Sequence, residues 1–144
     1  MAEGTGRRGR RPPDGEASMK KRVNLILLAG MVLPPLSYLF MSFDLGMAIA
    51  AAPVLGHVYP ALPFAFLQLL LCFNFRGRFS WLVRLLPLIL VAPFHLLGLY
   101  WIFIVSDAGG IPGIILTAFT TLPLEGAVLG WIAWAVLRRL GILE

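Results

Sequence analysis

The basic residues of this chain fall in three clusters that are separated by long apolar runs. All twelve Lys and Arg residues lie within positions 7–22, 76–84 and 138–139. The two intervening stretches carry acidic turns at Asp44 and Asp107 instead. Because loops rich in Lys and Arg remain on the cytoplasmic side, a charge that alternates in sign between apolar runs is typical of a multi-pass membrane protein.

The composition excludes a water-soluble domain. Hydrophobic residues make up 59% of the chain and charged residues 13%, whereas a soluble domain has about 25% charged residues. The net charge of +5 does not indicate nucleic-acid binding, because the basic residues flank apolar runs, where such residues bind anionic headgroups and set orientation. We therefore expect an integral membrane protein that contacts the lipid bilayer and binds no nucleic acid.

The apolar runs predict an all-α fold with four transmembrane helices that prolines kink. A helix needs about 20 residues to cross the hydrocarbon core. The predicted spans comprise residues 23–43, 55–75, 81–105 and 111–137.

The second span is the hardest to place. Residues 45–75 carry no charge, and as one straight helix they would measure about 45 Å, which exceeds the membrane core. Pro53, Pro60 and Pro63 favour a short interfacial or re-entrant segment up to about Gly56, followed by a true span. A single tilted and kinked helix is the alternative.

Residues 1–18 consist mainly of Gly, Pro, Arg and acidic residues, which predicts a disordered basic cytoplasmic tail before a four-helix transmembrane bundle at 19–144. Translation that starts at Met19 is an alternative. The basic clusters place both termini and the loop 76–80 in the cytoplasm. We therefore expect a multi-pass protein of the plasma (inner) membrane.

Glu125 is the candidate for chemistry within the membrane. It lies near the middle of the last span, where a carboxylate costs roughly 3 kcal/mol or more. Counted from the outer helix ends, His95 lies at a similar depth and is the expected partner. Thr117 and Thr121 precede Glu125 by eight and four residues and extend a polar stripe that could conduct protons or a solute. In the alternative, the threonines bond to their own i−4 carbonyls and Glu125 is a neutral acid that joins two helices.

Gly126 and Gly130 form a GxxxG pair in the same span. Such a pair lets another helix approach closely. It predicts a packing seam, either within the bundle or between two copies.

His57 and His95 raise a haem hypothesis, because membrane cytochromes hold b-type haem between histidines on neighbouring helices. The two histidines match in depth only if the second span begins near Ala48. The sequence has no metal-ligand spacing motif, so we expect no metal and no cofactor.

Three short segments resemble, in their order, the membrane domains of heterodimeric lycopene cyclases. They are Arg84-Leu85-Leu86-Pro87, Ala92-Pro93-Phe94 and Leu122-Pro123-Leu124-Glu125. In that family a Pro-x-Glu-Glu segment carries an essential acid, so the resemblance implies that role for Glu125. This chain has Gly126 at the position of the second Glu, and His95-Leu96 where a Trp-Asp pair follows in the family.

The sequence favours a non-enzymatic subunit or helix-bundle partner of a membrane complex, bound to another membrane protein or to copies of itself. With almost no residues outside the spans, we expect no enzymatic activity. The alternative is a small oligomeric proton-coupled transporter or channel that uses Glu125 and His95.

Overall fold

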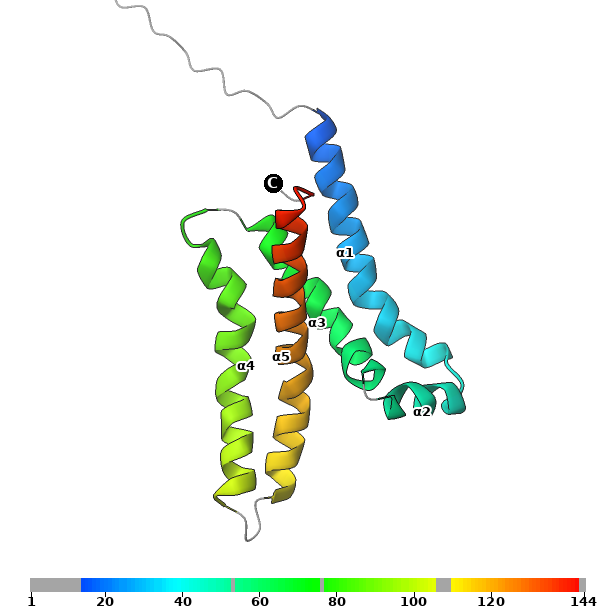
Figure 1. The fold of residues 1–144 in the computed structure, drawn as a ribbon, viewed down its shortest axis with the longest axis vertical. Coiled ribbons are helices and arrows are strands. Elements are labelled where there is room, and N and C mark those ends of the chain that lie inside the picture. The colour runs from blue at the N-terminus through cyan, green and yellow to red at the C-terminus, as the bar shows by residue number, and fades with distance from the viewer. Residues whose placement is uncertain (1–13, 53, 76, 106–109, 143–144) are drawn as a thin grey trace, which may run out of the picture.

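The computed structural model describes residues 14–52, 54–75, 77–105 and 110–142, which form five helices and no strand. The helices are α1 (Asp14–Phe40), α2 (Phe43–Ala51), α3 (Leu55–Asn74), α4 (Ser80–Phe103) and α5 (Gly110–Arg139) (Figure 1). Three of them, α3, α4 and α5, are long and apolar enough to cross a membrane. The prediction of an all-α fold is confirmed for the described residues, and three of the four predicted spans coincide with helices that could cross a membrane. A fourth span within α1 stays a prediction.

The first helix begins earlier than the sequence indicated. Residues 14–18, which we assigned to the disordered tail, belong to α1, and residues 1–13 lie outside the described residues. The reason is local, because Glu16, Ala17, Met19 and Lys20 all have high helix propensity and follow the last proline of the tail.

The uncharged stretch 45–75 contains two helices rather than one. Ser42 begins α2 as its N-cap, since its hydroxyl accepts a bond from the Leu45 amide at 3.4 Å. The helix ends at Ala51, and Ala52 is extended, with φ −76° and ψ 122°. A residue that precedes proline avoids the helical conformation, so Pro53 in the sequence accounts for this break.

The long helices lie in the order α4, α5, α3, α1. α5 contacts α3 and α4 along much of its length, and α1 contacts α3 (Figure 1). Within the described residues the long helices lie in an open row, because α1 joins the others through α3. The four-helix transmembrane bundle at 19–144 stays a prediction. The buried residues along the two seams of α5 are mostly small. They are Ala61, Ala65, Gln68 and Cys72 on α3, Gly98 on α4, and Gly113, Thr120, Gly126, Ala127 and Gly130 on α5.

Polar side chains join α1 to α3 at both ends of their contact. Asn24 and Asn74 donate reciprocal amide hydrogen bonds of 3.0 and 2.8 Å. Toward the other end, the hydroxyl of Ser37 bonds to that of Tyr59. Between these pairs, Gly30 lies directly against the ring of Phe66. The first helix is therefore held to α3 by two polar pairs and a close contact between them.

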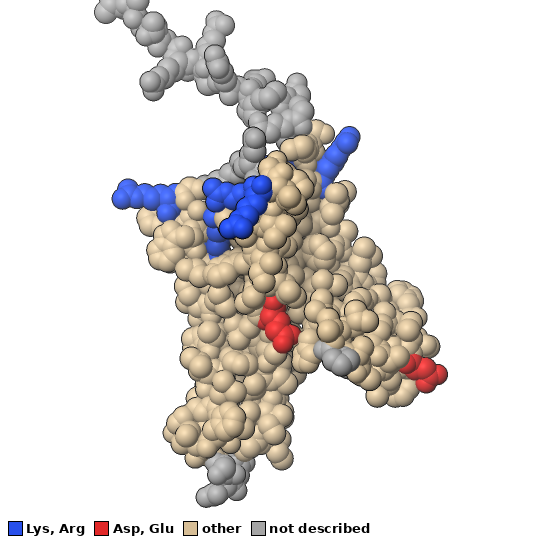
Figure 2. Space-filling view, in the orientation of Figure 1, with Lys and Arg blue, Asp and Glu red and all other residues tan. Residues whose placement is uncertain are grey.

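The charges are segregated along the long axis. Lys and Arg side chains gather at the end where α1 begins and α5 ends, and the acidic side chains visible on this face lie away from that end (Figure 2). The basic clusters, which are far apart in the sequence, therefore lie at one end of the folded chain.

Candidate functional site

Glu125 lies halfway along α5 and faces the beginning of α3. Its Oε1 is 3.6 Å from Nδ1 of His57. The Glu125 side chain is 36% exposed and that of His57 is 67% exposed, so the pair lies at the surface of the fold rather than in its interior. The other carboxylate oxygen, Oε2, is enclosed and has no hydrogen-bond partner among the described residues. One oxygen of the carboxylate is therefore still without a donor.

The pair lies in an open groove of about 440 Å³ between α3 and α5. Its walls are otherwise aliphatic, and the lining residues are His57, Val58, Leu124, Glu125, Val128 and Leu129. The groove thus combines one acid and one imidazole with a hydrophobic surface.

The structure gives Glu125 a different histidine from the one expected. His95 does not pair with it, because Nδ1 of His95 bonds instead to the hydroxyl of Thr120 at 2.9 Å, across the α4–α5 seam. Thr120 and Glu125 are five residues apart, which places them about 140° apart around α5. His57 takes the place of His95 because the start of α3 lies level with the middle of α5, as the contacts of Gly126 with Ala61 and Phe64 show.

The threonines of α5 do not extend a polar path to the groove. Thr121 donates to the Thr117 carbonyl at 2.7 Å, and Thr120 donates to the Leu116 carbonyl at 2.8 Å. The Thr117 hydroxyl is enclosed against Gly98 without a hydrogen-bond partner in the described part of the chain. None of the three lines the groove. Their arrangement corresponds to the alternative in which the hydroxyls bond back to their own helix.

The GxxxG pair faces α3. A Cβ atom on Gly126 would lie 2.5 Å from the carbonyl oxygen of Ala61, and one on Gly130 would lie 2.6 Å from that of Ala65. Both distances are shorter than a real Cβ atom tolerates. The pair therefore lies in a seam within the chain and is covered by α3.

The two histidines proposed as haem ligands contact different faces of α5. His57 lies beside Glu125 and His95 beside Thr120. The described residues also contain no group of three or more His, Cys, Asp or Glu side chains that could hold a metal ion. The arrangement does not bring His57 and His95 together on one site.

Two groups of residues were missed by the sequence reasoning. Gln68 is buried, and its Nε2 donates to the Arg84 carbonyl at 2.7 Å, which joins α3 to α4. Asn24 and Asn74 form the reciprocal pair described above. A signal was present, since an amide side chain in an apolar run must find a partner in the membrane, but the sequence does not identify the partner.

No family model, curated protein or solved structure matches this chain.

Proposed function

We propose that this chain is a non-enzymatic subunit of a membrane complex, and that the groove of His57 and Glu125 binds a transmembrane helix of a partner protein. The observation that carries the proposal is the position of the pair. It lies in an open, aliphatic groove on the surface of helices that can cross a membrane.

An uncovered groove of this kind would place a carboxylate and an imidazole against lipid tails. Ionisable side chains at this depth are costly and almost always face protein or water. A partner helix in the groove would remove both side chains from lipid. It would also bury the exposed aliphatic side chain of Val128 and the adjoining Leu129.

The chemistry of the groove defines the partner helix. Oε2 of Glu125 lacks a donor, so the partner carries a hydrogen-bond donor, such as Arg, Lys, Asn or Gln, at the level of Glu125. Aliphatic side chains on either side of that donor match the remaining walls. A second copy of this chain is a weaker candidate, because its GxxxG pair is already covered by α3.

The proposed topology has four spans with both termini in the cytoplasm of the inner membrane. The fourth span is the apolar part of α1, and α2 with the start of α3 forms a re-entrant segment, which keeps His57 at the depth of Glu125 near the middle of α5. Support comes from the charges, since the described Lys and Arg side chains gather at one end of the helices (Figure 2).

Site-specific photo-crosslinking in native membranes tests the groove. A photoreactive residue replaces Val128, which lines the groove, or Val136, a matched control on the same helix outside it. The two valines are similarly exposed, at 46% and 49%. We expect a protein adduct from position 128, lost when Glu125→Gln is added, and none from position 136. Equal labelling at both positions, or adducts only with a second copy, would overturn the proposal.

A proton-coupled transporter is the second candidate, and the short distance between two protonatable groups, His57 and Glu125, favours it. Here Glu125→Gln would abolish proton-dependent flux in liposomes of purified protein. Identical flux for the wild type and this variant contradicts transport through the pair.

A further inference from the structure

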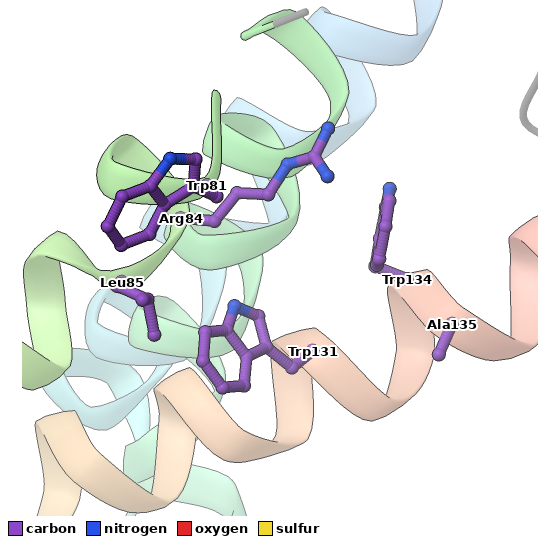
Figure 3. Close-up of a pocket in the computed structure, with 6 residues that line it drawn as sticks. All are labelled: Trp81, Arg84, Leu85, Trp131, Trp134 and Ala135. Atoms are coloured by element: carbon purple, nitrogen blue, oxygen red, sulfur yellow. The ribbon is translucent and has the colours of Figure 1, made fainter. Parts of the chain in front are cut away.

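A second pocket lies between α4 and α5, at the end of the molecule where the Lys and Arg side chains gather. It is an open pocket of about 430 Å³, a size typical of small-molecule sites, which span about 300–1,000 Å³. Figure 3 shows the Arg84 side chain extending from α4 toward Trp134 of α5, with Trp81 and Trp131 beside it. The lining residues are Trp81, Arg84, Leu85, Trp131, Trp134 and Ala135.

The cationic groups of this pocket lack a counterion. The Arg84 guanidinium carbon lies 4.5 Å from the centroid of the Trp134 ring, and that of Arg138 lies 5.4 Å from it. The one contact between an acidic and a basic side chain among the described residues, Glu125 with His57, is on the α3 side of α5. Two guanidinium groups thus approach the same ring without an acidic partner in the described part of the chain.

Arg84 also has unused hydrogen-bonding capacity. Of its five N–H donors, one bonds to the Phe75 carbonyl at 3.3 Å, and Nε is enclosed with no partner among the described residues. The backbone of Arg84 is held in place by Gln68 of α3, whose Nε2 donates to the Arg84 carbonyl. A guanidinium that is held in place and stacked on an indole presents a planar fork to an anion, and phosphate is the anion that this geometry suits.

We propose that this pocket binds the phosphate of an anionic phospholipid. The phosphate accepts hydrogen bonds from Arg84, with Arg138 adding positive charge, and the start of an acyl chain lies on Trp131 and Leu85. The aliphatic and aromatic walls favour a lipid over a free phosphate ion. Zwitterionic headgroups are disfavoured, because their ammonium group would meet two guanidinium groups.

Tryptophan quenching by brominated lipids tests the proposal with the full chain. In a Trp101→Phe background, the three remaining tryptophans are Trp81, Trp131 and Trp134, which all line the pocket. The protein is reconstituted in vesicles that contain brominated phosphatidylglycerol or brominated phosphatidylcholine. A salt concentration of about 0.5 M suppresses diffuse attraction between charges. We expect phosphatidylglycerol to be preferred by about five-fold near the tryptophans.

Arg84→Gln should abolish this preference, and Arg139→Gln should preserve it. The second variant is the matched control, because it removes the same charge from the neighbouring position of α5 outside the pocket. Arg138→Gln, at an exposed position, should lower the preference partially and tests the site even if Arg84→Gln does not fold. Equal quenching by both lipids in the wild type would overturn the proposal, as would equal losses in the Arg84 and Arg139 variants. Loss of the preference in inorganic phosphate, but not in chloride of equal ionic strength, would assign the site to a free anion instead.

Discussion

The two sides of α5 use small residues in different ways. On the α3 side, Gly126 would bring a Cβ within 2.5 Å of the Ala61 carbonyl oxygen, so backbone meets backbone. On the α4 side, the closest atom to a Cβ on Gly98 is the Thr117 hydroxyl, also at 2.5 Å, with backbone atoms at 3.0 Å or more. Burial follows the same order, since 22% of the apolar stretch of α3 is buried against 6% of that of α4. At Gly126 the backbone of α3 itself blocks a Cβ, whereas at Gly98 the first obstacle is a side chain. The α4–α5 seam is closed by backbone only at the start of α5, where a Cβ on Gly113 would lie 2.8 Å from the Gly98 carbonyl oxygen. The contact at Gly98 is therefore the one that a change of side chain can relieve.

The largest effect is expected from Gly126→Ala. The new methyl group would meet the Ala61 carbonyl and the Phe64 Cβ, neither of which can move without moving α3. We expect a loss of about 3 kcal/mol in the free energy of unfolding, the upper part of the range for overpacked sites. Unfolding in mixed micelles titrated with sodium dodecyl sulfate measures it.

Gly46→Ala is the control for this substitution. Nothing lies within 4 Å of a Cβ at Gly46, which is in the middle of α2. Its replacement should leave stability unchanged or raise it by up to about 1 kcal/mol, because alanine favours the helix. If the Gly126 variant unfolds no more easily than this control, the backbone contact between α3 and α5 is refuted.

On the α4 side, a glycine-to-alanine substitution should cost less stability, and a second substitution should restore most of the loss. We expect Gly98→Ala to cost about 1.5 kcal/mol. Most of this loss should return when Thr117→Ala is added, because the nearest obstacle is a side-chain hydroxyl that has no hydrogen-bond partner among the described residues. The coupling in a double-mutant cycle should be about 1 kcal/mol. Additive losses would show that α4 is held as rigidly as α3.

Much of the fold could be predicted from the sequence because hydropathy and proline act locally. The bounds of α4 and α5 lie within two residues of the predicted spans at each end. Pro53 also indicated the break before α3, because its effect on the preceding residue needs no tertiary information. The position of Gly126 in a seam follows from its lack of a side chain.

The partner of Glu125 could not be predicted from the sequence. Residue depths counted from the helix ends are comparable only if all helices begin at the same level in the membrane. α5 has 30 residues and α3 has 20, so the start of α3 lies level with the middle of α5. That offset brings His57 to Glu125 and leaves His95 to Thr120. Relative helix offsets are set by the seams of Gly126 and Gly98, and these are tertiary contacts.

A third seam, between α1 and α3, tests whether polar pairs can replace close backbone contact. Asn24→Leu and Asn74→Leu each remove one half of the reciprocal amide pair. The coupling energy should be about 1 kcal/mol, within the range measured for hydrogen bonds between membrane helices. The unfolding assay for both single variants and the double variant gives this value. A coupling indistinguishable from zero would mean that α1 is held by its other contacts with α3, among them the Ser37–Tyr59 bond and Gly30 against Phe66.

The smallest effect is expected at the single side-chain hydrogen bond described between α4 and α5. Thr120→Val keeps the shape of the side chain and removes the hydroxyl that bonds to His95. Thr121→Val is the matched control, because the bond described for its hydroxyl is to the Thr117 carbonyl of its own helix. The Thr120 variant should lose about 0.6 kcal/mol more than the control, the average for a hydrogen bond between membrane helices. A larger difference would mean that this hydrogen bond fixes α4 to α5 more tightly than an average one. No difference would mean that the seam is held by its other contacts, the packing at Gly98 and Gly113 and Arg84 on the Trp134 ring, because the variant then loses the His95 bond without cost.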